Sequence, residues 1–98
     1  MSFKQISVDQ TKQLIKVGNI TILDIRDPQS YSMGHISNAI HAEDIDINRF
    51  IDEEDKEKPL LVYCYHGHSS QSTAKYFTEN GFANVYSMDG GYTAWSQD

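Results

Sequence analysis

The chain has 98 residues, a formal net charge of −6 at pH 7 and a single cysteine. A chain of this length buries roughly two thirds of the surface that its unfolded form exposes, so we expect one domain, spanning residues 1–98, with an ordinary apolar core. Its 8 Lys and Arg residues are scattered, which argues against nucleic acid as a partner, because neutralising a phosphate backbone requires a basic stripe.

The first predicted element is a helix that begins after Ser7 and ends at Gly18. Gln10 follows Ser7 at the spacing of a capping box, in which the two residues satisfy each other's backbone N–H groups at the start of a helix. Two short strands are then predicted over residues 20–25 (ITILDI) and 38–41 (NAIH), because both are short apolar runs bounded by turn-forming residues.

Much of the acidic charge lies between residues 43 and 57. Among these carboxylates, four apolar residues recur at roughly helical spacing: Ile45, Ile47, Phe50 and Ile51. An acidic run beside apolar helix positions is typical of a solvated helix face rather than of a metal site. We therefore predict a short surface helix in this segment.

The remaining strands are predicted over residues 59–64 (PLLVYC) and 84–88 (NVYSM). The first of them is apolar almost throughout, as is typical of a strand buried on both faces. Between them we expect a helix that is capped by Ser69 or Ser70 and ends at Gly81. Strands that alternate with helices predict an α/β fold with a central parallel sheet and helices on both faces.

In open α/β sheets, ligands bind beyond the carboxyl ends of the strands. Three unusual segments fall at that edge in this chain, residues 24–28 (DIRDP), 64–70 (CYHGHSS) and 88–91 (MDGG). In the last of them, Gly90 and Gly91 permit a tight turn. We therefore expect the functional site where these three segments meet.

Cys64 stands at the end of a predicted strand, where a loop leads into a helix. A lone cysteine in a strand is often a small apolar packing residue. Here, however, the first amides of the following helix lack intrahelical partners and carry the positive end of the helix dipole. Loop amides turned inward would form a nest that favours the thiolate and holds a small anion beside it. We therefore predict that Cys64 is a reactive nucleophile with a lowered pKa.

Three segments in a fixed order carry a resemblance to a known family: residues 24–40 (DIRDPQSYSMGHISNAI), 64–70 (CYHGHSS) and 85–95 (VYSMDGGYTAW). They closely resemble the single-domain rhodaneses, which are thiosulfate sulfurtransferases. The resemblance implies an α/β fold around a parallel sheet and a cysteine that carries a persulfide. By position, that cysteine is Cys64, and the anion-binding loop consists of Tyr65, His66, Gly67, His68 and Ser69.

The reaction implied by this resemblance needs no cofactor and no metal. The Cys64 thiolate takes the outer sulfur of thiosulfate, and a second nucleophile, cyanide or a thiol acceptor such as thioredoxin, removes it in a ping-pong sequence. Many loops of the family carry an arginine where this chain has Tyr65 or Ser69, so this loop has no permanent positive charge. His66 and His68 supply positive charge only when they are protonated.

A cysteine phosphatase or arsenate reductase is the competing enzyme, because it also holds a thiolate in an anion-binding loop. Such enzymes clamp the oxyanion with an arginine six positions after the cysteine, where this chain has Ser70. A rhodanese-like sulfur carrier or regulatory module is the competing binding protein. Regulatory modules of this kind usually lack the cysteine that this chain retains.

A metal-binding module is a further alternative, since Cys64, His66 and His68 are all soft ligands. A structural zinc ion would need a fourth ligand, which only the distant His35 or His41 offers. Alternating residues on a tight loop rarely converge on one ion, so we expect no metal here. His35 is instead expected to pack and form hydrogen bonds within the fold.

Asp24 and Arg26 flank the predicted site at a spacing typical of a structural ion pair, although such a pair can also orient the loop. Tyr92 and Trp95 are expected to close the core from a final helix. The first residues carry neither the basic cluster nor the apolar stretch of a secretory signal, and no segment is apolar enough to enter a membrane. Since the lone thiol is expected to be reduced, we predict a cytoplasmic protein.

Overall fold

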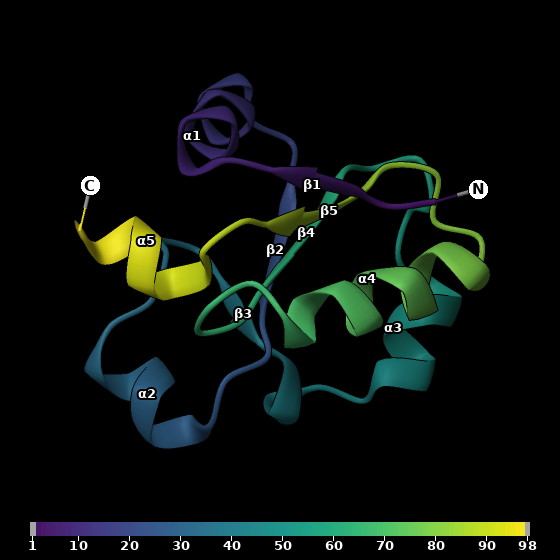
Figure 1. Cartoon of the computed structure of the whole chain (residues 1–98). Coiled ribbons are helices and arrows are strands. Elements are labelled where there is room, and N and C mark those ends of the chain that lie inside the picture. The colour runs from purple at the N-terminus through teal and green to yellow at the C-terminus, as the bar shows by residue number, and fades with distance from the viewer. Residues whose placement is uncertain (1, 98) are drawn as a thin grey trace.

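The computed structural model describes residues 2–97 and contains a five-stranded sheet in the order β1-β5-β4-β2-β3 (Figure 1). The strands are β1 Lys4–Ile6, β2 Thr21–Asp24, β3 Ile40–His41, β4 Leu60–Tyr63 and β5 Val85–Met88. The helices are α1 Val8–Val17, α2 Pro28–Met33, α3 Ile47–Glu53, α4 Ser69–Glu79 and α5 Gly91–Gln97, with a short 3₁₀ helix η1 at Ala42–Asp44. Every strand pair is parallel, so the predicted α/β fold is confirmed.

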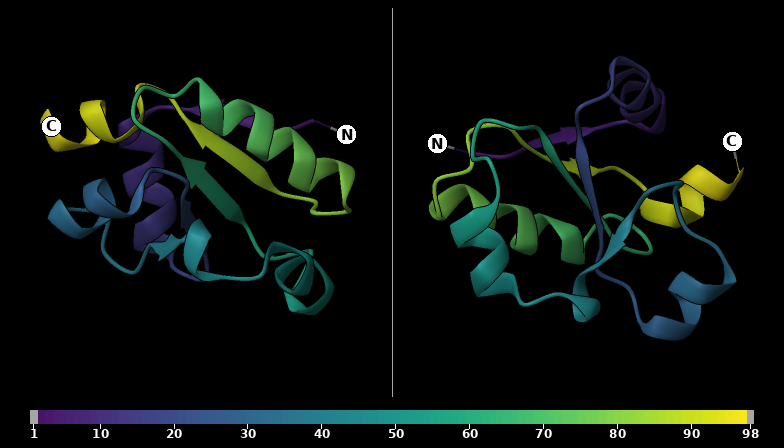
Figure 2. Two further views of the ribbon diagram at one scale, coloured as in Figure 1. Left: turned by 90° about the horizontal axis from the view of Figure 1, so that it is seen from below. Right: turned by 180° about the vertical axis from the view of Figure 1, so that it is seen from behind.

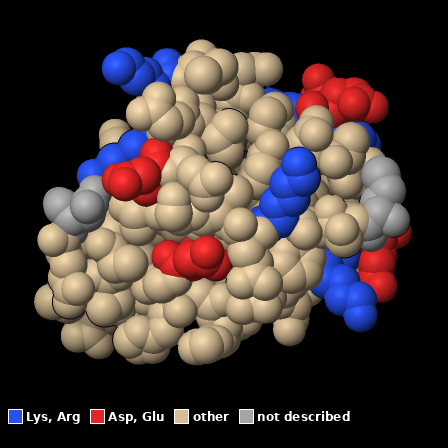
Figure 3. All heavy atoms as spheres, turned by 45° about the horizontal axis from the view of Figure 1, so that its top comes forward, with Lys and Arg blue, Asp and Glu red and all other residues tan. Residues whose placement is uncertain are grey.

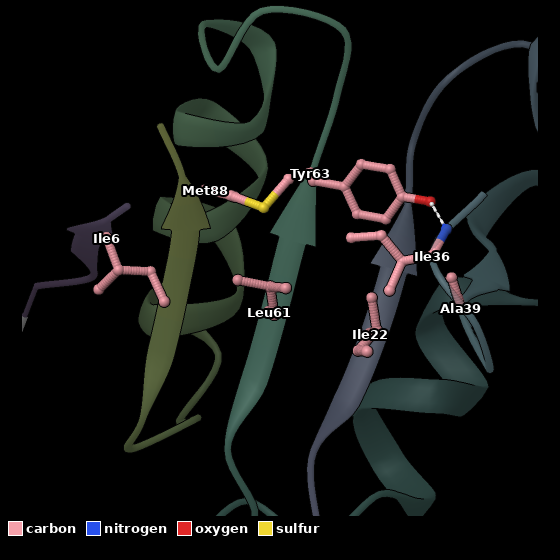
Figure 4. Close-up of a cluster of buried hydrophobic side chains, with 7 residues drawn as sticks. All are labelled: Ile6, Ile22, Ile36, Ala39, Leu61, Tyr63 and Met88. Carbon is pink, nitrogen blue, oxygen red and sulfur yellow. Dashed lines mark hydrogen bonds between the residues drawn. The ribbon is translucent and has the colours of Figure 1, made fainter. Parts of the chain in front are cut away.

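The side chains of β4 alternate between two apolar clusters, one on each face of the sheet. Leu61 and Tyr63 belong to the cluster in Figure 4, which is covered by α1, α2 and α5. Leu60 and Val62 belong to the opposite cluster, which is covered by α3 and α4. Figure 2 shows the two groups of helices on either side of the sheet. The strand is thus buried on both faces, as its continuous apolar sequence predicts.

The predicted ends of two helices are confirmed. At the start of α1, Ser7 Oγ accepts a hydrogen bond from the Gln10 amide at 3.1 Å, and Gln10 Oε1 accepts one from the Ser7 amide at 2.8 Å. After α4, Gly81 has a φ of +96°, and the Phe82 amide donates to the Phe77 carbonyl at 3.2 Å. This is the hydrogen bond of a Schellman motif, which explains why the chain turns at a glycine.

The predicted start of α4 is wrong. The N-cap residue is His68, and it makes no side-chain capping hydrogen bond. Ser69 and Ser70 lie in the first turn of the helix instead. The hydroxyl of Ser70 is turned toward the sheet, where it meets buried partners, and it is therefore not available to cap the helix.

Two elements of the structure are not predicted by the pattern of apolar residues. The strand β1 has only three residues, and its sequence KQI is mostly polar. The helix α2 has six residues and no apolar stripe, but it carries start signals, because the Asp27 side chain caps the Ser30 amide at 3.1 Å and Pro28 occupies its first turn. The predicted short helix in the acidic segment is present as α3, which begins after Asp46 and so does not include Ile45.

Acidic and basic side chains are mixed on one face of the molecule (Figure 3). On the face drawn in Figure 3, Lys and Arg side chains lie apart from one another and alternate with Asp and Glu, so this face carries no basic stripe. No helix within residues 2–97 has the length and apolar character needed to cross a bilayer.

Candidate active site

The segments that follow β2, β4 and β5 meet at one edge of the sheet, as the parallel topology requires. The loop between β4 and α4 lies beside the start of α5 (Figure 1), where the Tyr92 amide donates to the Cys64 carbonyl at 2.8 Å. On the other side, the Tyr65 ring lies 5.7 Å from Cζ of Arg26, which follows β2. The three segments singled out in the sequence are therefore neighbours in space.

The loop after β4 surrounds a small pocket. Its volume is about 170 Å³, and it is lined by Cys64, Tyr65, His66, His68 and Ser69. Cys64 itself is only 5% exposed, so its sulfur lies at the inner end of the loop rather than on the surface. Of the loop residues predicted from the family resemblance, only Gly67 does not line this pocket; it is buried, and its backbone lies against that of Gly90.

The Cys64 sulfur is surrounded by hydrogen-bond donors. The backbone amides of Gly67 and Ser70 donate to Sγ at 3.2 and 3.3 Å. The Ser70 hydroxyl oxygen lies 3.4 Å from the same sulfur. A loop and the first turn of a helix thus turn their donors inward, which is the amide nest that the sequence predicts, together with one side-chain hydroxyl.

These contacts decide the ionisation of the thiol. Burial raises the pKa of Cys64, but hydrogen bonds from the Ser70 hydroxyl and from the Ser70, Gly67 and His66 amides outweigh it, so that the pKa is lowered overall. The stabilisation comes from neutral dipoles, not from a charged side chain. At a given pH, the thiolate is therefore more populated than in a free cysteine.

Alkylation of Cys64 should accordingly titrate with an apparent pKa below the free-thiol value of ~8.5. The measurement is the rate of iodoacetamide modification as a function of pH, followed by intact mass. A small free thiol run under the same conditions provides the reference curve. An apparent pKa at or above that reference would show that Cys64 is merely a buried packing residue.

The start of α5 orients the peptide groups of the loop. The Tyr92 amide binds the Cys64 carbonyl, and the Thr93 amide binds the Tyr65 carbonyl at 3.0 Å. In a trans peptide the N–H points opposite to the C=O. Holding the Tyr65 carbonyl on the α5 side therefore turns the His66 amide toward the sulfur, where it contributes to the lowered pKa of Cys64.

The predicted turn of two glycines makes this contact possible. Gly91 has a φ of +58°, and a Cβ placed there would lie 2.5 Å from the carbonyl oxygens of Cys64 and Tyr65. A Cβ on Gly67 would lie 2.8 Å from the Gly90 amide nitrogen. The glycines thus allow the backbone of the turn and that of the Cys64 loop to touch directly.

Asp24 and Arg26 form a buried ion pair behind the loop. Arg26 Nη2 lies 2.7 Å from Asp24 Oδ2, which also accepts a hydrogen bond from the Tyr63 hydroxyl at 2.6 Å. Burial raises the pKa of Asp24, but the hydrogen bonds from Arg26 and Tyr63 outweigh this effect, so the pKa is lowered overall and the carboxylate stays ionised. Arg26 also donates to the Gly34 carbonyl and lies 4.1 Å from the Tyr92 ring. The pair therefore joins β2, α2 and α5, which is a structural role.

The exposed side chains of the loop have separate partners. The Tyr65 hydroxyl forms hydrogen bonds with the side chains of Asp27 and Ser30. His66 Nδ1 lies 3.3 Å from Thr93 Oγ1. These contacts hold the outer part of the loop against α2 and α5 and leave the pocket open between them.

The histidines do not assemble a metal site. His35 hydrogen bonds to the Tyr31 carbonyl at 2.8 Å and stacks on the Tyr31 ring, as expected, but its side chain is exposed rather than packed. His41 is buried and bonds to the Arg26 carbonyl at 2.6 Å. Within the described chain, no group of three or more His, Cys, Asp or Glu residues is placed to hold a metal ion, so the metal-binding alternative lacks a ligand set.

The sequence does not predict that two further residues lie beside Cys64. Ser70 was expected as a helix cap, and Ser87 carried no expectation at all. In the structure, Ser70 Oγ lies 2.7 Å from Ser87 Oγ of β5, and both side chains are buried. The one signal in the sequence is a serine within the otherwise apolar strand VYSM.

Known proteins resemble this chain in sequence and in fold. The model of the family described as "Rhodanese-like domain" matches residues 7–98. The chain is 47% identical over 95 residues to "Thiosulfate sulfurtransferase GlpE" of Pseudoalteromonas translucida, with 97% of this chain and 90% of the relative covered. A protein of the same name from Shewanella oneidensis is 45% identical over 96 residues, covering 98% and 95%.

The fold agrees with these sequence matches. The crystal structure of a rhodanese-like domain protein from Staphylococcus aureus superimposes with a TM-score of 0.80 and 26% identity, covering 95% of this chain and 91% of that one. The family model spans all three segments that carry the resemblance as well as the pocket around Cys64. The chain therefore belongs to the rhodanese-like domain family.

Proposed function

We propose that the protein is a thiosulfate sulfurtransferase that carries sulfur as a persulfide on Cys64. The observation that carries this proposal is the Cys64 sulfur, which faces two amide donors and one hydroxyl at the inner end of a small pocket. The names of the relatives at 47% and 45% identity support the same donor, thiosulfate.

In the first half of the reaction, the Cys64 thiolate attacks the outer sulfur of thiosulfate. A bond forms between the two sulfurs as the S–S bond of thiosulfate breaks, and its electron pair leaves with sulfite. The charge is conserved, since a thiolate and a dianion become a persulfide anion and a sulfite dianion. The loop amides that line the pocket stabilise these anions, and this step consumes no cofactor or metal.

In the second half, an acceptor attacks the outer sulfur of the persulfide. The S–S bond breaks, the electron pair returns to Cys64 Sγ, and the thiolate is regenerated. Cyanide or a thiol can act as the acceptor, and a protein dithiol such as thioredoxin is the physiological acceptor that we propose. Since an unpaired reactive thiol persists in a reducing compartment, we propose that the reaction takes place in the cytoplasm.

The phosphatase alternative receives no support from the side chains at the site. The position where such enzymes have their arginine is occupied by Ser70, whose hydroxyl is turned to the sulfur. The guanidinium of Arg26, which lies 5.7 Å from the Tyr65 ring, is engaged by Asp24. Without a free guanidinium group, the loop cannot bind two oxygens of a phosphate at once.

The test is to incubate the reduced protein with thiosulfate, remove small molecules and measure the intact mass. We expect the gain of one sulfur atom, which cyanide or a dithiol then removes. Hydrolysis of p-nitrophenyl phosphate by the same preparation is measured in parallel. A protein that gains no sulfur, or that turns over the phosphate ester instead, contradicts the proposed function.

A further inference from the structure

Two buried hydroxyl groups stand in line behind the Cys64 sulfur. Ser70, in the first turn of α4, is 0% exposed, and Ser87, on β5, is 1% exposed. The Ser70 oxygen lies 3.4 Å from Cys64 Sγ and 2.7 Å from the Ser87 oxygen. Among the described residues, neither hydroxyl has another hydrogen-bond partner.

We propose that this serine pair stabilises the Cys64 thiolate as the leaving group when the acceptor removes the outer sulfur. Ser70 contacts the reacting atom and is a catalytic residue in this sense, whereas Ser87 acts through Ser70 and is a positioning residue. The inference rests on the proposed function, because it assigns a role within the second half of that reaction.

A count of hydrogens shows why the pair favours the thiolate. Two hydrogen-bond links join the three atoms Cys64 Sγ, Ser70 Oγ and Ser87 Oγ. With the thiolate, two hydrogens fill both links, since Ser87 donates to Ser70 and Ser70 donates to the sulfur. A protonated sulfur brings a third hydrogen, for which this row of atoms has no acceptor. In that state Sγ can donate to Ser70 Oγ and Ser70 to Ser87, but the hydrogen of the buried Ser87 hydroxyl is then left over. Every hydrogen of the row has an acceptor within it only when the sulfur carries the negative charge.

The two halves of the reaction use this charge differently. In the persulfide, the charge or proton resides on the outer sulfur, so a donor aimed at Sγ contributes little. When the acceptor takes the outer sulfur, the electron pair returns to Sγ, where the Ser70 hydroxyl meets it. A thiolate with a lower pKa leaves faster but attacks more slowly. The serine pair should therefore accelerate discharge of the persulfide rather than its formation.

Within residues 2–97, no charged side chain is placed to stabilise the Cys64 thiolate in place of the serine pair. The titratable side chains of the adjoining loops, His66, His68 and Asp89, are exposed. Arg26, the buried cation on the β2 side, is paired with Asp24. The largest contributions that lower the pKa of Cys64 are hydrogen bonds, with that of the Ser70 hydroxyl the largest among them.

The first measurement is the pKa of Cys64 from the pH dependence of alkylation. Ser70→Ala should raise it by about one to two units, as expected for the loss of a hydrogen bond to a charged group. Ser87→Ala should raise it by about half a unit, because Ser70 remains but is no longer polarised by a second hydroxyl. Thr78→Val is the matched control, since it removes another buried hydroxyl from α4, one that donates to the Ala74 carbonyl at 3.0 Å. It should leave the pKa unchanged.

The second measurement gives the rate of each half-reaction separately. It is made at a pH above the pKa of Cys64 in every variant, so that the thiol is ionised throughout. Loading from thiosulfate and discharge to cyanide are followed separately by rapid quench and intact mass. Because thiolate nucleophilicity rises with basicity by a coefficient of ~0.4 to 0.5, a pKa rise of about one to two units should make Ser70→Ala load about three- to tenfold faster, while its discharge becomes several-fold slower. Ser87→Ala should show the same pair of changes at smaller size.

Opposite changes in the two half-reactions support the inference, since a packing defect slows both or neither. The inference is overturned if both steps slow equally, or if Ser87→Ala matches the control in pKa and in both rates. Should Ser70→Ala fail to fold, Ser87→Ala decides the outcome alone. A parent protein that gains no sulfur from thiosulfate contradicts the proposed function instead, and the alkylation pKa values still report whether the serine pair acts on Cys64.

Discussion

Replacing Cys64 with serine should abolish sulfur transfer from thiosulfate while leaving the fold intact. A hydroxyl accepts hydrogen bonds from the Gly67 and Ser70 amides much as the sulfur does, so the loop keeps its donors satisfied. It cannot, however, form a persulfide. We expect neither a gain of mass on incubation with thiosulfate nor measurable production of thiocyanate from thiosulfate and cyanide.

Circular dichroism and the thermal midpoint check that the Cys64→Ser protein is folded. Cys64→Ala serves as a second variant, because it removes the nucleophile without adding a hydroxyl beside Ser70. Loss of transfer in both folded variants is the expected result. Turnover retained in either of them would show that the sulfur of Cys64 is not the carrier, and the mechanism would be wrong.

Replacing Gly91 with alanine should strongly destabilise the protein. The new Cβ would lie 2.5 Å from the backbone oxygens of Cys64 and Tyr65, and no flexible side chain can yield there. The φ of +58° adds a conformational cost for any residue with a Cβ. Together, the strain and the overpacking should lower the free energy of unfolding by about 2 to 5 kcal/mol.

A displacement of the loop would also turn the His66 amide away from the sulfur, since α5 orients that peptide group. Sulfur transfer in Gly91→Ala should therefore fall even under conditions in which the protein remains folded. The alkylation pKa of Cys64 should rise at the same time, because donors to the thiolate are lost.

Gly81→Ala is the matched control for this prediction. Gly81 also has a positive φ, +96°, but a Cβ there would meet nothing within 4 Å. This variant should lose only about 1 to 2 kcal/mol and keep its activity, because it carries the backbone cost without the steric clash. Urea unfolding of both variants measures the difference. Equal losses of stability with full activity in both would refute the role assigned to the contact between α5 and the loop.

The position of Cys64 at the end of a strand explains only part of its environment. The amides of the following loop were expected from the sequence, because any helix begins with unpaired N–H groups. The contribution of Ser70 was not expected, since a serine at the start of a helix usually caps it. Its direction is set by the packing of α4 on β5, which brings Ser87 within hydrogen-bond distance.

By itself, the sequence determined the features that depend on neighbouring residues. The alternation of apolar runs predicts the order of strands and helices, and the capping box at Ser7 places the start of α1, because periodicity and capping act within a few residues. The end of the apolar run at Cys64 likewise predicts that this residue lies at the edge where open α/β sheets usually bind ligands. The sequence does not predict the short elements β1 and α2, because they bury little apolar surface and therefore show no apolar periodicity.

The tertiary structure alone decided which distant residues act together at the site. The parallel crossovers bring Ser87 behind Cys64 and the turn at Gly91 against the carbonyl of that cysteine. Residues some twenty positions apart along the chain, as Cys64 and Ser87 are, leave no periodic signal in the sequence. Their contacts depend on how strands pair and helices pack across the whole sheet, because the free energy that holds them in place comes from burying both faces of that sheet together.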